Sequence, residues 1–211
     1  MTDPAVETAV EPLENARPRR RRPRAERHVT LFRVGALTIG DRRELCLIKN
    51  ISTGGMLIRV YSDVAVGTRL AIELKHGESV AGQAQWVERE SVGVCFDKPI
   101  DVISLLSLRQ EGPRPRMPRI EVDCFATVRD GATVIRTKAV NISQGGLQVR
   151  SSAELDVRAD VMVSLTGLPP EPAVVKWRDG EIYGISFNRL LSITQLVSWL
   201  QARQERTSAA G

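Results

Sequence analysis

The hexapeptide Asn-Ile-Ser-Thr-Gly-Gly at residues 50–55 returns 91 residues later as Asn-Ile-Ser-Gln-Gly-Gly at 141–146. The same offset relates three later positions, since Trp86, Gly93 and Phe96 recur as Trp177, Gly184 and Phe187. A repeat at one fixed offset over this much of the chain indicates two copies of one structural unit. We therefore expect an acidic, disordered tail at 1–16, a first domain at 17–110 and a second at 114–205.

Each copy contains short runs in which apolar residues alternate with polar ones, separated by glycine and polar turns. In the first copy these runs lie near residues 29–34, 45–50, 56–60, 70–74, 80–86 and 92–96. Alternation with period two is typical of strands that bury one face. Six closely spaced strands predict a mainly β fold, with two tandem six-stranded antiparallel barrels.

A short helix is expected after each barrel. In the first copy Asp101 is the expected cap, with Ile103, Leu105 and Leu106 on the apolar face and Gly112-Pro113 as the stop. In the second copy Ser192 and Gln195 form a capping box. The apolar positions Ile193, Leu196, Val197 and Leu200 share one face. This second helix is expected to plug a barrel end or to pack against the other domain.

Charge is unevenly distributed along the chain, although the net charge is only +5. Residues 1–16 carry four acids and no base, whereas residues 17–27 carry seven arginines and no lysine. Arginine offers a planar fork for phosphate and a face that stacks on a base. A second, sparser cluster (Arg114, Arg116 and Arg119) precedes the second copy. Taken alone, a terminal basic run is as typical of a solvated tail as of a binding segment.

The repeated hexapeptide offers groups suited to an anionic purine nucleotide. Asn50 and Ser52 are two residues apart and so point to one side of a strand. Ser52 is expected to bond a backbone amide two residues on. Gly54 and Gly55 permit positive φ and close backbone approach. The hexapeptide alone is more typical of a plain hairpin turn, but its coupling to arginines in both copies favours a nucleotide site.

The tryptophans, cysteines and histidines say less about function than the hexapeptide does. Trp86 and Trp177 are candidates for stacking platforms, but their place in strand patterns favours core packing. Cys46, Cys95 and Cys124 are expected to be buried, reduced thiols. With two histidines, and neither a catalytic triad nor a metal-ligand cluster in the sequence, we expect no enzyme activity and no metal. The chain shows neither a membrane-span pattern nor a signal-peptide pattern, and a cytoplasmic location is expected.

The arginine clusters and the repeated hexapeptide resemble the sequence pattern of the PilZ family of bacterial receptors for cyclic di-GMP. The family pattern is R-x-x-x-R before the first strand, followed by [DN]-x-S-x-x-G at a turn. The resemblance covers residues from about 20 to 205. It implies that the arginines wrap the ligand while the Asn/Ser turn binds guanine and phosphate. The residues implied for the first site are Arg20, Arg24, Arg27, Asn50, Ser52 and Gly55. Those implied for a second site are Arg116, Arg119, Asn141, Ser143 and Gly146.

The two copies differ in their arginines. Arg20 and Arg24 meet R-x-x-x-R, whereas the second copy holds only the shortened R-x-x-R of Arg116 and Arg119. Arg27 lies 23 residues before Asn50, but Arg119 lies 22 before Asn141, which predicts a hairpin loop one residue shorter in the second copy. We expect the first domain to bind cyclic di-GMP and the second to bind weakly or not at all.

The expected function is therefore a non-enzymatic, cyclic di-GMP-binding adaptor. Ligand would change the arrangement of the domains, and a protein effector, such as motility or exopolysaccharide machinery, would detect the change. Nucleic-acid binding by a small barrel is an alternative, which an aromatic content of 4% disfavours. A further alternative is a degenerate PilZ scaffold for protein–protein interaction.

Overall fold

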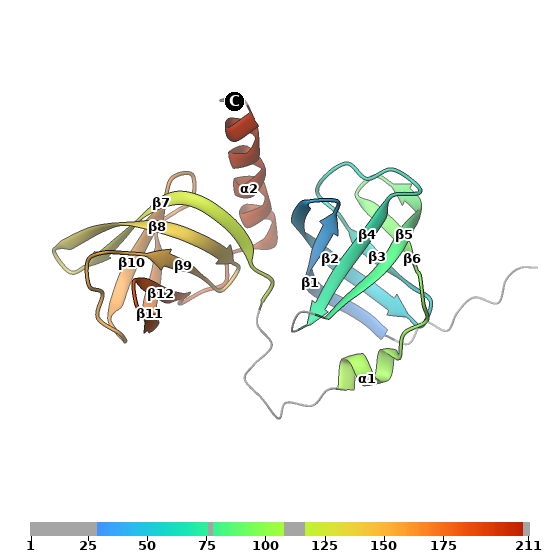
Figure 1. The fold of residues 1–211 in the computed structure, drawn as a ribbon, viewed down its shortest axis with the longest axis horizontal. Helices are drawn as coiled ribbons and strands as arrows, with labels where there is room; N and C mark the ends of the chain where they lie inside the picture. The colour runs from blue at the N-terminus through green and yellow to red at the C-terminus, as the bar shows by residue number, and fades with distance from the viewer. Residues whose placement is uncertain (1–28, 76–77, 108–116, 209–211) are drawn as a thin grey trace, which may run out of the picture.

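The computed structural model describes residues 29–75, 78–107 and 117–208, which contain two closed antiparallel barrels (Figure 1). The first barrel consists of β1 (Val29–Ile39), β2 (Arg42–Ser52), β3 (Gly55–Arg59), β4 (Arg69–Lys75), β5 (Glu78–Glu88) and β6 (Ser91–Phe96). The second consists of β7 (Ile120–Asp130), β8 (Thr133–Ser143), β9 (Gly146–Arg150), β10 (Asp160–Leu165), β11 (Glu171–Asp179) and β12 (Ile182–Phe187). The mainly β prediction and both six-stranded barrels are confirmed.

The two barrels share one strand order. It runs β1-β2-β3-β6-β5-β4 in the first and β7-β8-β9-β12-β11-β10 in the second. Alternating residues fill each interior, as the period-two pattern predicts. Ile48, Ile58 and Ile72 are fully buried in the first barrel, and Ile142 and Val149 are fully buried in the second. Each barrel therefore has its own apolar core.

The helix after the first barrel is α1 (Val102–Ser107). Asp101 caps it, because its Oδ1 accepts a hydrogen bond from the Ser104 amide at 3.0 Å. Hydrogen bonds from Ser104 also lower the pKa of the Asp101 carboxyl. The expected burial of Ile103 is wrong, since this side chain is 66% exposed while Val102 is buried. A helix of six residues has room to place only part of its surface against the barrel.

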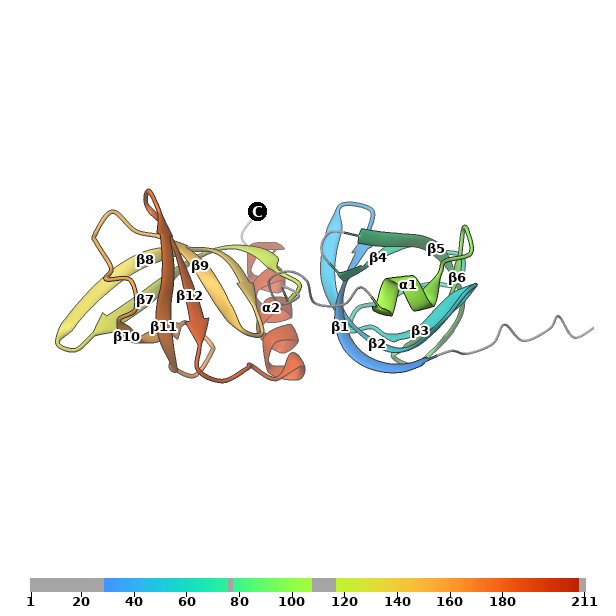
Figure 2. The same ribbon diagram turned by 90° about the horizontal axis from the view of Figure 1, so that it is seen from below.

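The helix after the second barrel is α2 (Ile193–Ser208), and it makes both of the contacts expected for it. Its N-cap forms as predicted, with the Gln195 amide donating to Ser192 Oγ at 3.1 Å. Leu196 is fully buried in the second core, and Trp199 Nε1 donates to the carbonyl of Thr166 at 2.9 Å. Figures 1 and 2 show α2 between the two barrels. The same helix therefore closes one barrel and faces the other.

The first barrel meets α2 through the outer side of its first hairpin. Leu45 is buried not in its own barrel but in the core cluster of the second domain, and Val34 and Tyr61 pack against that cluster. Gln201 of α2 donates a hydrogen bond to the carbonyl of Tyr61. Arg43 Nε donates to the carbonyl of Arg119 at 3.4 Å. The interdomain contact is thus an apolar patch bordered by a few hydrogen bonds.

Replacing Leu45 with alanine tests this contact. We expect the free energy of unfolding to fall by about 2–4 kcal/mol, because a buried leucine is truncated and a cavity remains. Urea denaturation of the full chain measures the change. Leu190→Ala removes the same atoms from an exposed side chain and is expected to change stability by less than about 0.5 kcal/mol. Equal losses in the two variants would contradict burial of Leu45 between the domains.

Candidate functional site

The repeated hexapeptide forms the turn between the second and third strands of each barrel. Ser52 pairs with Gly55 across the turn, and Ser143 pairs with Gly146. Each serine hydroxyl donates to the paired glycine carbonyl, at 3.0 Å in the first barrel and 3.2 Å in the second. The expected bond from Ser52 to an amide two residues on is wrong. Because the strands pair right up to the turn, the carbonyl three residues on lies closer to the hydroxyl.

The second glycine of each hexapeptide lets two strands approach closely. A Cβ atom on Gly55 would lie 2.3 Å from the carbonyl oxygen of Val94, and one on Gly146 would lie 2.1 Å from that of Ile185. Any other residue would therefore push the hairpin away from the adjacent strand. This close approach confirms one of the two roles expected for the paired glycines, and it brings the Asn/Ser turn beside β6 or β12.

Both tryptophans lie on the outer surface, so the expectation of core packing is wrong. Trp86 is 45% exposed and Trp177 is 37% exposed. The register shifts between Ala84 and Trp86, and again between Val175 and Trp177. Such a bulge adds one residue to the strand and reverses the face to which the next side chain points. The period-two pattern of the sequence does not reveal this reversal.

Each tryptophan ring covers a glycine of the neighbouring strand. A Cβ atom on Gly93 would lie 2.0 Å from Trp86 Nε1, and one on Gly184 would lie 2.1 Å from Trp177 Cε2. The recurrence of Trp and Gly at the same spacing was the sequence signal for this pair. The ring thereby forms one wall of a pocket beside the Asn/Ser turn.

The pocket of the first barrel has a volume of about 280 Å³. It is lined by Asn50, Ser52, Gly54, Gly55, Gln85, Trp86 and Cys95, among others. Three residues implied by the sequence therefore lie together, namely Asn50, Ser52 and Gly55. Arg20, Arg24 and Arg27 lie outside the described residues. Gln85, Trp86 and Cys95 were not expected in the site.

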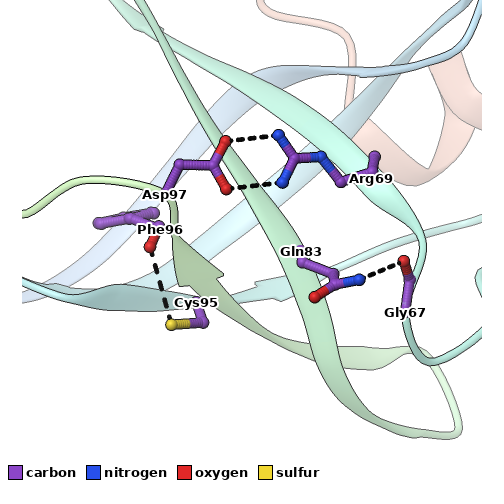
Figure 3. Close-up of polar contacts among 6 residues, drawn as sticks. All are labelled: Gly67, Arg69, Gln83, Cys95, Phe96 and Asp97. Atoms are coloured by element: carbon purple, nitrogen blue, oxygen red, sulfur yellow. Dashed lines mark hydrogen bonds and ion pairs between the residues drawn. The ribbon is translucent and has the colours of Figure 1, made fainter.

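Cys95 is exposed, contrary to the expectation that all three cysteines are buried. Its thiol lies at the pocket and makes a weak hydrogen bond to the carbonyl of Phe96 at 3.8 Å (Figure 3). Nearby, Arg69 forms a two-pronged ion pair with Asp97 at 2.9 and 2.7 Å. Cys46 is buried as expected, and burial raises its pKa to about 12. Cys124 is half-buried, and burial raises its pKa as well.

The equivalent pocket of the second barrel has a volume of about 200 Å³. It is lined by Met117, Arg119, Ser143, Gly145, Lys176, Trp177 and Ser186, among others. Arg119 Nη1 donates to Asn141 Oδ1 at 2.7 Å, and Asn141 Nδ2 donates to Gln148 Oε1. Asn141, Ser143, Gly146 and Arg119 thus gather around one turn, whereas Arg116 lies outside the described residues. Lys176 and Gln148 were not expected from the sequence.

The predicted difference in hairpin length between the copies is wrong. Ile39 pairs with Arg42 in the first barrel, and Asp130 pairs with Thr133 in the second, so both turns contain two residues. Val29 pairs with Ile51 and Ile120 with Ile142, again at the 91-residue offset. By this register Arg119 takes the sequence position of His28, not of Arg27. The spacing from arginine to asparagine differs because the arginine lies one position closer to the first strand in the second copy, while the hairpin is the same length.

The two sites differ more in the hydrogen bonding of their asparagine side chains than in their backbones. Leu57 lies opposite Asn50, whereas Gln148 lies opposite Asn141. Both the carbonyl and the amino group of the Asn141 side chain are therefore occupied. Within the part of the chain that the structure describes, the Asn50 amide has no hydrogen-bond partner. Among the described residues nothing engages the Asn50 amide, whereas the Asn141 amide is engaged on both sides.

The described lining of the two pockets also differs in charge. Arg119 and Lys176 contribute two cations to the second pocket. Gln85 occupies the first-barrel position that corresponds to Lys176, and the described residues lining the first pocket include no lysine or arginine. Thr30 pairs with Asn50, so the chain that follows the seven arginines enters the barrel at this pocket. The described lining of the first pocket therefore supplies no cation of its own.

Among the residues that the structure describes, no group of three or more His, Cys, Asp and Glu side chains is arranged to hold a metal ion. No helix in those same ranges has the length and apolar character to cross a membrane.

Comparison with solved structures gives distant matches. Borreliella burgdorferi PlzA in complex with c-di-GMP is 14% identical, with a TM-score of 0.37, over 80% of this chain and 86% of that one. Escherichia coli YcgR in complex with c-di-GMP is 14% identical, with a TM-score of 0.34, over 84% and 85%. Bacillus subtilis MotI/DgrA, an inhibitor of motility, is 14% identical, with a TM-score of 0.34, over 84% and 99%. The comparison with curated proteins gave no match.

The family model for the PilZ domain matches twice, over residues 18–111 and 113–202. These two matches span most of the chain and correspond to the two barrels with their Asn/Ser turns. The protein therefore belongs to the PilZ domain family and carries two copies of the domain.

Proposed function

We propose that this protein is a non-enzymatic cyclic di-GMP receptor whose first barrel is the main binding site. The observation that carries the proposal is the first-barrel pocket, where Asn50, Ser52 and Trp86 meet at the point where the arginine-rich segment enters the fold. The Asn50 amide offers both a donor and an acceptor to a guanine edge. The arginines 20, 24 and 27 supply forks for the two phosphates.

The first site is favoured over the second by the state of the asparagine. No described residue bonds the Asn50 amide, whereas a ligand at Asn141 must first displace Gln148 and Arg119. A hydrogen bond exchanged for another contributes little net free energy, so displacement lowers affinity. The cations Arg119 and Lys176 act in the opposite direction and attract phosphate to the second pocket. We therefore assign weak binding to the second site.

Strand β1 provides a route from the ligand to the second domain. Its Thr30 end lies beside Asn50, and four residues later Val34 packs against the core cluster of the second domain. Ligand that orders residues 17–27 against the pocket holds the start of this strand in place. The angle between the barrels then changes at the Leu45–α2 contact, and a protein effector detects the changed surface.

Replacing Arg24 and Arg27 together with alanine tests the arginine clamp. We expect affinity for cyclic di-GMP to fall by at least about tenfold, because two charge-assisted contacts to phosphate are removed. Calorimetry on the full chain measures this, with GTP as the control ligand. Arg89→Ala, an exposed arginine on another turn of the same barrel, is the matched control and is expected to leave affinity unchanged. Unchanged affinity in the double variant would contradict the proposed clamp.

Exchanging the residues opposite the asparagines tests why the sites differ. In the Arg24/Arg27 double variant, we expect Gln148→Leu to strengthen binding at the second site by about threefold to tenfold, because the amino group of Asn141 is released from Gln148. The reciprocal Leu57→Gln in the wild-type chain is expected to weaken the first site by a similar factor. Calorimetric titration separates the two effects. Two variants with wild-type affinities would show that occupancy of the asparagine amide does not distinguish the sites.

Cys95 provides a chemical probe of the first pocket. N-ethylmaleimide at mildly alkaline pH is expected to modify Cys95 first, because this thiol is exposed while burial raises the pKa of Cys124 and of Cys46. Saturating cyclic di-GMP should slow modification of Cys95 and leave Cys124 unaffected, as followed by peptide mass spectrometry. If the ligand binds without protecting Cys95 from modification, the binding site of the ligand lies outside this pocket.

A further inference from the structure

The second barrel carries an exposed face on the outer side of β8, β7 and β10, which we call the β7–β8 face. It is formed by Phe125, Arg129, Val134, Arg136, Lys138 and Met162. Phe125 is 59% exposed, Val134 is 55% exposed and Met162 is 37% exposed. Val134 and Met162 pair with Arg129 from its two sides, and Lys138 pairs with Phe125. Apolar side chains and cations therefore alternate on one continuous surface.

The corresponding face of the first barrel seats a helix. At the 91-residue offset, Val34 corresponds to Phe125 and Leu45 to Arg136. Val34 and Leu45 pack against the second-domain cluster that includes Val197 of α2. The β7–β8 hairpin instead projects away from the first barrel in both ribbon views (Figures 1 and 2). One barrel thus shows how a helix fits this face of the fold, and the other presents the same face uncovered.

The uncovered face differs from the corresponding face of the first barrel in the chemistry of its side chains. The aliphatic Val34 and Leu45 of the first barrel are replaced by an aromatic ring and a guanidinium. Arg136 lies over the ring of Phe125, with Cζ 3.7 Å from the ring centroid. This stacking holds the guanidinium flat while its N–H edges remain available. Such a face suits an occupant that is apolar in part and negatively charged in part.

The charges on the face support an acidic occupant. Among the described residues, neither Arg129 nor Arg136 has a carboxylate within 4.0 Å. Lys138 is already paired with Asp123 at 3.0 Å. Beyond Lys138 the face leads into a groove of about 720 Å³ that is lined by both acids and bases, including Asp123 and Arg150. The available positive charge is therefore at the Arg129–Arg136 end.

We infer that the β7–β8 face is the docking surface for an acidic amphipathic helix of a partner protein. The apolar side of the helix packs on Phe125, Val134 and Met162, and its carboxylates bind Arg129 and Arg136. The seating of α2 on the first barrel is the structural precedent within this same chain. The inference rests on the proposed function only in assuming that the protein acts through a protein effector. It does not depend on the nucleotide pocket.

A synthetic peptide tests the face directly. The probe is a fluorescein-labelled helix of leucine and glutamate, arranged so that leucines share one side. We expect saturable binding to the full chain by fluorescence anisotropy, and about tenfold weaker binding to Arg136→Glu, because an attractive charge becomes repulsive. Arg89→Glu makes the same change of charge on an exposed turn of the first barrel and is the matched control. Should Arg136→Glu fail to fold, Phe125→Ser carries the same comparison.

Several outcomes would overturn the inference. The first is that wild type, Arg136→Glu and Arg89→Glu bind the peptide equally, or do not bind it. The second is that a peptide with lysine in place of glutamate, or one interrupted by proline, binds as well as the probe. The third is that duplex DNA binds this face, with loss in Arg136→Glu, while the acidic peptide does not. That result would assign the surface to nucleic acid.

Titration of the same samples with cyclic di-GMP separates this inference from the proposed function. We expect Arg136→Glu to keep wild-type affinity for the dinucleotide, because Arg136 lines neither pocket. Peptide binding without dinucleotide binding would reject the receptor proposal and leave the docking face intact. Dinucleotide binding without peptide binding would reject the docking face alone.

Discussion

Both pockets depend on the close approach of a glycine to the backbone of a neighbouring strand. Gly55 lies against the carbonyl of Val94, and Gly146 lies against that of Ile185, with no space for a Cβ atom. This contact keeps the Asn/Ser turn against the strand that carries Gly93 or Gly184, over which the tryptophan lies. A side chain at either glycine position would separate the turn from the ring. The Asn/Ser turn and the tryptophan ring therefore take their positions from backbone packing.

The first hairpin of the barrel has a different role in each of the two domains. In the first barrel, the start of β1 borders the pocket while Val34 and Leu45 pack against the second domain. In the second barrel, Glu121 near the start of β7 pairs with Asn141, while the middle of the hairpin presents Phe125 and Arg136 to solvent. One hairpin joins the first pocket to the domain contact, and the other joins the second pocket to an exposed surface.

Divergence at the two pockets lies in side chains, since strand order, the first hairpin, the Asn/Ser turn and the shift before each tryptophan agree between the repeats. Substituting Gln148 for Leu57 saturates the neighbouring asparagine, and substituting Lys176 for Gln85 adds a cation to the pocket wall. The two changes have opposite effects on an anionic ligand. A domain with the full turn motif can therefore differ from its neighbour in affinity without any change of fold.

The sequence by itself determined the two-barrel fold, the strand positions, the helix caps and the meeting of Asn50, Ser52 and Gly55. These features follow from alternation, turn chemistry and a repeat at an offset of 91 residues, all of which can be read along the chain. Only the tertiary structure decided that Trp86 faces outward, that Asn141 is engaged and that Leu45 belongs to the core of the other domain. A bulge, a cross-strand hydrogen bond and an interdomain contact each join residues whose relation depends on strand register and packing, which no local pattern encodes.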